Sequence, residues 1–208
     1  MRKKDELAID RIMECAKKEF LEKGFENASM RTIAEDSSYT TGMLYSRFKN
    51  KDELFHELVK DKAEALYRYF EEGQKEFAHF SPFKQENDLH SYVDQKVEGM
   101  VELVYQDYDI YKLIISKSKG SSYEFYLERF IALEEENTMR FIHDLNQAGI
   151  KIKEVRADLC HMLVTALFKG MFEVVEHDFS KEEAILYIKE IQNFFNAGWD
   201  ALLGLKKE

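Results

Sequence analysis

Five residues within the stretch 41–47 have the chemistry to contact nucleic acid. They are Thr41, Gly42, Met43, Tyr45 and Arg47. Hydroxyl and guanidinium groups bind phosphates or base edges, a glycine lets the backbone approach closely, and a methionine can cover a thymine methyl group. Because Leu44 is apolar and Phe48 follows at the far end of the stretch, the pattern predicts a short helix that packs on one side and presents the five residues on the other.

A helix-turn-helix is the arrangement that would position these residues. Ile33 and Ala34 are the inward-facing pair of a first helix, and residues 35–38 then break its pattern. Thr40 can cap the following helix, because its hydroxyl can accept a hydrogen bond from a free backbone N–H. Two short helices joined by a turn also occur in many other helical proteins, so this motif needs support from its surroundings.

Both flanks of the motif supply that support. Residues 12–25 form an amphipathic pattern that ends near Gly24, and glycine is suited to the left-handed end of a helix. On the other side, Asn50 can cap the next helix and Glu53 occupies the capping-box position. The sequence therefore predicts a helix on each side of the motif.

Residues 9–55 resemble the DNA-binding domain of the TetR/AcrR family of bacterial one-component transcriptional regulators. The matching positions are Ala16, Phe20, Gly24, Phe25, Ile33, Ala34, Thr40, Thr41, Gly42, Met43, Leu44, Tyr45, Phe48, Lys51, Asp52, Glu53 and Leu54. The resemblance implies an all-α fold, with an N-terminal three-helix DNA-binding domain in residues 1–55 and a larger helical ligand-binding and dimerisation domain in residues 56–208. It also implies a homodimer that binds a palindromic operator in double-stranded DNA and is released by a small apolar or amphipathic effector, most often as a repressor.

Chemistry and resemblance together nominate nine DNA-binding residues. Arg31 matches a family position that reaches a base edge or a phosphate, and Tyr45 matches a tyrosine that binds phosphate. Two positions depart from the family pattern. Ser38 stands where glycine is usual, at a cost of about 1–2 kcal/mol if its backbone is left-handed, and Met43 replaces a small hydroxyl residue, which leaves the base preference open. The nine are Arg31, Thr40, Thr41, Gly42, Met43, Tyr45, Arg47, Lys49 and Lys51.

The net charge of −10 is distributed in a way that is compatible with binding DNA. Residues 1–60 contain 12 basic and 12 acidic side chains, so the whole excess of negative charge belongs to residues 61–208. An acidic second region should discourage indiscriminate binding to nucleic acid. A small basic patch on an acidic molecule favours a short, specific site.

Helical patterns continue to the end of the sequence. A long helix from Lys51 should end at Gly73 and the segment before Pro82, the only proline. Three helices are expected in residues 89–105, 107–116 and 123–148, followed by a nearly all-apolar helix in 157–176. The last helix should start at Ser180, with Glu183 completing a capping box.

Aromatic residues are concentrated in the second region and suggest a small-molecule cavity, because such cavities are mostly apolar with a few polar groups. Ordinary core packing is the alternative for each aromatic residue taken alone. A carboxylate within the apolar helix could bind an amine, although such a residue more often reaches solvent or pairs internally. The candidate ligand-binding residues are Tyr105, Tyr108, Phe125, Phe130, Phe141, Phe168, Phe172 and Glu173.

The last two helices are expected to pair with their copies in a second chain as a four-helix bundle. Apolar residues of the final helix recur in steps of four and three, which suits packing at a shallow angle. The alternative is that this seam packs only inside its own chain. The proposed interface residues are Leu163, Ala166, Gly170, Ala184, Ile188, Ile191, Phe195 and Leu202.

Other classes of function find little support in the sequence. It contains no nucleophile elbow, phosphate-binding glycine loop or zinc-binding helix motif, so we expect no enzyme, no catalytic residue, no cofactor and no metal. No apolar run is long enough to span a membrane, and no signal region begins the chain, which predicts a cytoplasmic protein. Cys15 and Cys160 are expected to be small buried groups without a disulfide. A helical ligand-binding module or carrier with no role on DNA remains the alternative function.

Overall fold

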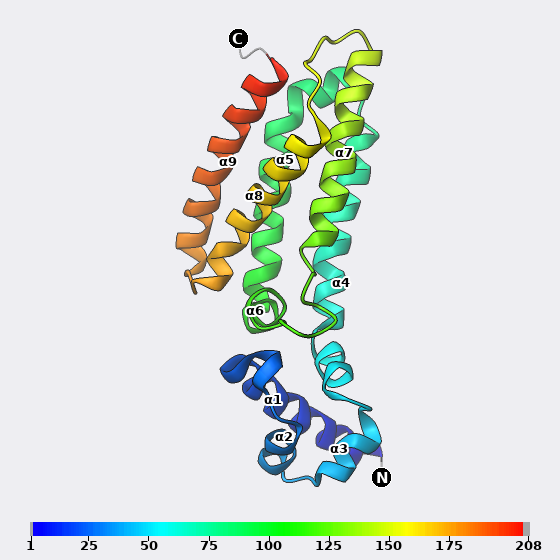
Figure 1. Cartoon of the computed structure of the whole chain (residues 1–208), viewed down its shortest axis with the longest axis vertical. Coiled ribbons are helices and arrows are strands. Elements are labelled where there is room, and N and C mark those ends of the chain that lie inside the picture. Colours follow the sequence, from blue (N-terminus) through cyan, green and yellow to red (C-terminus); the bar gives the residue numbers. More distant parts are fainter. Residues whose placement is uncertain (1, 206–208) are drawn as a thin grey trace. The chain divides into compact units, whose positions relative to one another are not determined.

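A computed structural model describes residues 2–205, with side chains from residue 7 onward. Within these residues the chain forms α-helices and no strands, which confirms the expected all-α class (Figure 1). The helices are α1 (Arg2–Asn27), α2 (Met30–Ser37), α3 (Thr41–Arg47), α4 (Lys51–Ala78), α5 (Pro82–Gln106), α6 (Tyr108–Ser116), α7 (Glu128–Gln147), α8 (Ala157–Glu176) and α9 (Lys181–Leu203). No helix in the described part of the chain combines the length and the apolar character that crossing a bilayer requires.

The chain divides into two compact units. Unit 1 comprises residues 1–65 and 107–126, and unit 2 comprises residues 66–106 and 127–208. Helix α4 belongs to both, because the division falls between Ala65 and Leu66. This division differs from the domain boundary expected after residue 55, since unit 1 also takes in part of α4, all of α6 and the turn that follows it.

Aromatic side chains explain why these later residues belong to unit 1. Phe55 of α4 is fully buried and meets the rings of Phe20 and Phe25 edge-on, at centroid distances of 5.0 and 5.4 Å. Tyr111 of α6 donates its hydroxyl to the Lys62 carbonyl oxygen at 2.9 Å. Tyr126 donates to the Ala63 carbonyl oxygen at 2.7 Å. Residues distant in sequence therefore complete the core around the N-terminal helices.

Unit 2 contains the rest of α4 together with α5, α7, α8 and α9. Helix α8 contacts both α7 and α9, and α5 contacts both α7 and α9. Figure 1 shows α8 between α7 and α9. The apolar character of α8 follows from this position, because a helix with neighbours on several sides must present apolar residues in several directions.

Several helix boundaries agree with the sequence and others differ from it. Helix α8 covers the expected residues, and Ser180 and Glu183 form the expected capping box at the start of α9. Gly73 does not end α4, which continues to Ala78, and Pro82 is the first residue of α5. Helix α7 begins at Glu128, because residues 123–127 form a turn.

Candidate nucleic-acid interface and ligand pocket

Local hydrogen bonds fix the turn between α2 and α3. The Ser29 hydroxyl caps α2 by accepting from the Thr32 N–H, at 3.4 Å. At the other end, Ser38 is left-handed, with φ 65° and ψ 33°, and the Tyr39 N–H donates to the Ala34 carbonyl oxygen at 2.8 Å. A serine therefore occupies the strained position expected from the sequence, at a cost of about 1–2 kcal/mol. Its hydroxyl accepts a hydrogen bond from Arg11 at 3.1 Å.

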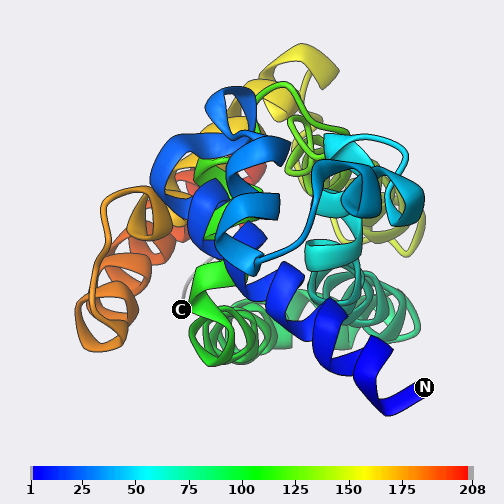
Figure 2. The same cartoon turned by 90° about the horizontal axis from the view of Figure 1, so that it is seen from below.

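Helix α3 is anchored on one side and exposed on the other. Thr40 caps it as expected, since its hydroxyl accepts from the Met43 N–H at 3.2 Å. Leu44 has no exposed surface and Phe48 is 5% exposed, whereas Met43 and Tyr45 are 54% and 49% exposed. Figure 2 shows the blue ribbons of α1, α2 and α3, which belong to unit 1. The outward face of α3 is therefore open to a partner.

Most of the nine nominated residues lie on exposed surface. Thr40, Gly42 and Arg47 are exposed like Met43 and Tyr45, and Thr41 is half-buried. Lys49 is also exposed. Residues of α3 and its cap thus present hydroxyl, thioether, phenol and guanidinium groups together.

Two of the nominated basic residues have partners inside unit 1. Arg31 pairs with Glu35 one helical turn away, at 2.8 Å, and this hydrogen bond raises the pKa of the guanidinium. Such an exposed pair is easily exchanged for a phosphate. The Lys51 ammonium donates to the carbonyl oxygens of Glu26 and Ala28, at 3.0 and 3.1 Å. These bonds complete the end of α1, so Lys51 has a structural role in this fold and is not part of the proposed contact surface.

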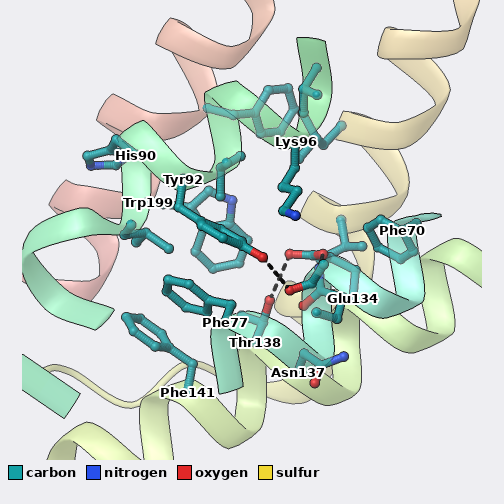
Figure 3. A pocket seen from close by; sticks show the side chains of 18 of the residues that line it. Phe70, Phe77, His90, Tyr92, Lys96, Glu134, Asn137, Thr138, Phe141 and Trp199 are labelled. Carbon is teal, nitrogen blue, oxygen red and sulfur yellow. Dashed lines mark hydrogen bonds between the residues drawn. The ribbon is translucent and has the colours of Figure 1, made fainter. Parts of the chain in front are cut away.

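Unit 2 holds a pocket of about 180 Å³ lined by residues of α4, α5, α7, α8 and α9 (Figure 3). Its walls are mostly aromatic and aliphatic. Pairs of rings define them, including Phe77 with Tyr92 and Phe70 with Phe168, at centroid distances of 5.2 and 5.6 Å. An apolar, concave space with a few polar groups is typical of a ligand site. The aromatic residues that line it are Tyr69, Phe70, Phe77, Tyr92, Phe141, Phe168, Phe195 and Trp199.

The eight candidate ligand-binding residues lie in different parts of the structure. Phe141 and Phe168 line the pocket. Phe130 is fully buried and packs against Phe70 as core. Tyr108 and Phe125 belong to unit 1, and so cannot line a pocket of unit 2.

The other three candidates also lie outside this pocket. Tyr105 donates its hydroxyl to the Phe179 carbonyl oxygen at 2.9 Å, and burial raises its pKa. Phe172 is 6% exposed and, with Tyr105, lines a second and much smaller cavity of about 30 Å³. The Glu173 side chain is 42% exposed and pairs with His177 at 2.8 Å, so it is not the buried carboxylate that the sequence suggested.

A different carboxylate faces the pocket. Glu134 of α7 accepts hydrogen bonds from the Gln74 amide at 2.6 Å and the Thr138 hydroxyl at 3.5 Å, and it lies beside Asn137 among the aromatic rings in Figure 3. Its remaining surface opens onto the pocket. Burial raises its pKa to about 7, although the two hydrogen bonds act in the opposite direction. Neither hydrogen-bonding partner carries a charge.

Lys96 is the basic group of α5 that lines the same pocket. Its ammonium donates to Glu76 at 2.7 Å, which raises the pKa of Lys96 and lowers that of Glu76. Tyr92 donates to Glu76 at 2.9 Å and to the Gly73 carbonyl oxygen at 2.8 Å. Burial, followed by the bond to Glu76, raises the pKa of Tyr92 to about 12. Lys96 and Glu76 therefore neutralise each other at this edge of the pocket.

Sequence reasoning missed Glu134, the aromatic residues of α4 and Trp199. One signal for Glu134 was present, because Phe130, Glu134, Thr138 and Phe141 recur at helical spacing along α7 and so share a face. A carboxylate on a helix face that has phenylalanine at both ends indicates a special environment. No comparable signal existed for Tyr69, Phe77 or Trp199, which resemble ordinary core residues.

The predicted interface residues of α8 and α9 are only partly available to another chain. Ala184 and Ile188 are 0% and 5% exposed, so they are buried within their own chain. Gly170 faces the same chain too, because a Cβ there would lie 3.3 Å from Ile191 Cδ1. Ala166 is exposed, whereas Leu163, Ile191, Phe195 and Leu202 are half-buried.

A different set of apolar residues on these two helices is exposed. On α8 these are Leu159 and Met162, with exposures of 37% and 67%. On α9 these are Leu186 and Phe194, with exposures of 65% and 75%. We call these four residues the apolar face. The packing seam and the exposed stripe of α9 are therefore on different sides of the helix.

The remaining chemistry of the chain is limited. In the described part of the chain, no three His, Cys, Asp or Glu residues lie together in a group that could hold a metal ion. Cys15 is half-buried and Cys160 is buried, both as free thiols. Burial raises the pKa of Cys160 to about 11, which keeps it a protonated, unreactive thiol.

Comparisons with known proteins agree with this arrangement. Residues 12–58 match the family described as bacterial regulatory proteins, tetR family. The chain is 30% identical over 106 residues to the HTH-type transcriptional regulator UidR of Escherichia coli strain K12, an alignment that covers 50% of this chain and 47% of UidR. The chain thus aligns with about half the length of the curated relatives it matches.

The fold is similar to solved structures along most of its length. The TetR family transcriptional regulator PfmR from Thermus thermophilus matches with a TM-score of 0.57 and 22% identity, covering 88% of this chain and 97% of that one. The transcriptional regulator FadR from Bacillus subtilis, in complex with stearoyl-CoA, matches with a TM-score of 0.54 and 14% identity, covering 89% and 96%.

The sequence match includes α3 and its exposed residues. The structural matches extend the similarity to the helical fold of unit 2. Residues 12–58 thus match the tetR family of bacterial regulatory proteins, and the fold of the chain is similar to that of solved TetR-family regulators.

Proposed function

We propose that this protein is a ligand-responsive transcriptional repressor that binds a palindromic operator as a homodimer. The observation that carries the proposal is the geometry of α3, which has Leu44 fully buried while Met43 and Tyr45 are about half exposed. A short helix held in this way can enter the major groove with its polar residues towards the bases and phosphates. The proposed contacts are Arg31, Thr40, Thr41, Gly42, Met43, Tyr45, Arg47 and Lys49.

A gel-shift titration at about 0.15 M salt tests DNA binding, using the DNA upstream of the protein's own gene. Arg47→Ala should weaken DNA binding roughly 5- to 150-fold. It should also reduce the slope of log affinity against log salt concentration by the amount expected for about one phosphate contact. Tyr45→Phe should weaken binding less, because it removes one hydroxyl group. Arg156→Ala is the matched control, since Arg156 is an exposed arginine of unit 2, with 81% side-chain exposure.

Equal DNA binding by Arg47→Ala, Tyr45→Phe and Arg156→Ala would contradict the proposal and return the chain to the class of ligand carriers. Folding of each variant is checked by its thermal unfolding. A loss of DNA binding confined to the α3 variants, with unfolding unchanged, supports the repressor.

Dimerisation follows from the operator, because two recognition helices must lie about one duplex turn apart to bind a palindrome. The apolar face supports a second copy of this chain as its occupant, since large exposed apolar side chains on neighbouring helices are typical of interfaces. Phe194, at 75% exposure, is the most exposed residue of that face. We expect Phe194→Asp to shift the mass measured by light scattering from dimer towards monomer, and Phe83→Asp, at a 73% exposed position on α5, to leave it unchanged.

The pocket supports a response to an effector, because α4 supplies part of its wall and also belongs to unit 1. A ligand that prefers one arrangement of α4 can thereby change the population of the DNA-binding form. To move the protein from almost fully bound to almost fully released, the ligand must prefer the released form by about 10⁴-fold, or about 5.5 kcal/mol. Release of labelled operator on adding ligand is the measurement that checks this.

A further inference from the structure

Glu134 gives the pocket an unbalanced negative group. Its hydrogen-bonding partners, Gln74 and Thr138, are neutral, and in the described part of the chain no lysine or arginine forms an ion pair with it. A carboxylate enclosed by apolar groups is destabilised in its charged form unless a cation accompanies it. The raised pKa of Glu134 is a consequence of this situation.

The basic groups that line the pocket already have acidic partners. Lys96 binds Glu76 at 2.7 Å, and Arg140 binds Glu136 at 3.4 Å and the Asn137 side-chain oxygen at 2.6 Å. An anionic ligand would have to displace one of these carboxylates. A cationic ligand would instead complete the pairing of Glu134.

Gln85 adds a second polar group of the same kind. It is 4% exposed and lines the pocket, and its amide nitrogen donates to the Phe77 carbonyl oxygen at 3.0 Å. Its side-chain oxygen accepts no hydrogen bond from the described residues. This oxygen is covered by surrounding atoms, so it adds negative potential to the pocket wall, whereas Glu134 is the carboxylate that lines the pocket and favours a positively charged group.

The aromatic walls favour the same charge. Ring faces attract organic cations by roughly 0.5–2 kcal/mol each, and more strongly where water is excluded. Phe70, Phe77, Tyr92 and Trp199 surround the space beside Glu134 in Figure 3. The volume of about 180 Å³ is also informative, since an engineered apolar cavity of about 150 Å³ in another protein holds one benzene ring.

We propose that the pocket binds a small organic cation, with its aromatic or aliphatic part between the rings and its positive charge beside Glu134. This inference rests on the proposed function in one respect, which is that the bound cation acts as the effector. Binding of the cation is a separate property, which can be measured without DNA.

Trp199 provides the readout, because it lines the pocket and is the only tryptophan in the sequence. The probes are phenyltrimethylammonium and its neutral isostere tert-butylbenzene, which differ by the replacement of a positively charged nitrogen by carbon. Benzenesulfonate is the anionic probe. Changes in Trp199 fluorescence on titrating the full chain at pH 8 should give an affinity for the cation at least tenfold above those for the other two probes.

Glu134→Gln should lower the affinity for the cation at least tenfold and leave that for tert-butylbenzene unchanged, which also shows that the variant is folded. Glu135→Gln is the matched control, since Glu135 is the next residue and pairs with His161 at 3.2 Å, and it should change neither affinity. Equal affinities for cation and isostere, no binding of any probe, or an undiminished cation preference in Glu134→Gln would each overturn the inference.

Protons should compete with the cation for Glu134. The pKa of Glu134 is about 7, so its carboxylate becomes protonated as the pH falls below that value. The affinity for the cation should then drop by up to tenfold per pH unit, while the affinity for the isostere stays constant. The other titratable groups lining the pocket are Tyr69, His90, Tyr92, Lys96, Arg140 and Asp144. The competition should therefore be absent in Glu134→Gln, and its persistence there would assign it to one of these groups and count against Glu134.

Failure of this inference and failure of the proposed function give different results. If phenyltrimethylammonium binds beside Glu134 but does not release operator DNA, the site is correct and the effector response is wrong. If the protein binds operator as a dimer but prefers the neutral probe, the repressor stands and the cation site is wrong.

Discussion

The helix-turn-helix of unit 1 and the pocket of unit 2 differ in the contacts that build them. Helix α3 is positioned by bonds between near neighbours, such as Thr40 with the Met43 N–H and Phe48 with the Leu44 carbonyl oxygen. The pocket is assembled from five helices, and one of its hydrogen bonds joins Gln74 to Glu134, 60 residues apart. A surface specified by local bonds depends on few residues, whereas a pocket with many walls can tolerate changes in one of them.

Truncation of a leucine in each region should show the largest difference. Leu44 has no exposed surface and is the only fully buried residue of the seven in α3, so we expect Leu44→Ala to lower the free energy of unfolding by about 2–4 kcal/mol. Leu89 is half-buried on the pocket wall, where truncation enlarges an existing space, so Leu89→Ala should cost about 1 kcal/mol. Denaturant titration measures both, and equal losses would contradict the comparison.

The same contrast explains which features could be predicted from the sequence. The caps at Thr40 and Ser180 and the bounds of α8 follow from residues a few positions apart, and each was predicted. The motif in α2 and α3 was recognisable for the same reason. Such signals are local, so they survive without knowledge of the tertiary fold.

Features that depend on distant packing were not predicted. Tyr111 and Tyr126 connect residues 107–126 to unit 1 through long-range hydrogen bonds. The division of the chain therefore differs from the boundary expected after residue 55. Ala184 and Ile188 follow a regular seam, but periodicity does not say whether the seam meets its own chain or another. The pocket residues were hidden because aromatic side chains of a core and of a cavity have the same pattern.

The acid–base behaviour of Glu134 provides a prediction of intermediate size. Its pKa is about 7 in the folded protein, against 4.5 for an unperturbed glutamate, so between these pH values the folded state holds a proton that the unfolded chain has released. The stability due to this proton is present below pH 4.5 and is lost as the pH rises through 7. Glu134→Gln should therefore gain stability over the parent above pH 7, by about 1–2 kcal/mol once partial access of solvent is considered.

Thermal unfolding of both proteins from pH 4 to pH 8 measures this effect. The two profiles should converge near pH 4.5 and separate towards pH 7. Glu135→Gln, which changes a neighbouring carboxylate, should not reproduce the separation. Parallel profiles for Glu134→Gln and the parent would show that the pocket does not perturb this carboxyl.

The smallest expected effect concerns the turn between α2 and α3. Ser38 is left-handed with φ 65°, a conformation in which glycine lacks the steric cost of a Cβ atom. Ser38→Gly should raise the free energy of unfolding by about 0.5–1 kcal/mol. This net gain is smaller than the relieved strain, because the variant loses an exposed hydrogen bond with Arg11 and has a more flexible unfolded chain.

Ser37 allows the same substitution one residue earlier, and there the sign should reverse. Ser37 is helical and fully buried, and its hydroxyl donates to the Ile33 carbonyl oxygen at 2.7 Å. Ser37→Gly should therefore lower the free energy of unfolding by about 1–2 kcal/mol, because it loses this bond and places glycine inside a helix. Opposite signs at adjacent residues, measured by denaturant titration, would show that the turn is specified residue by residue. Equal signs would mean that packing of the whole unit sets its geometry, as in the pocket.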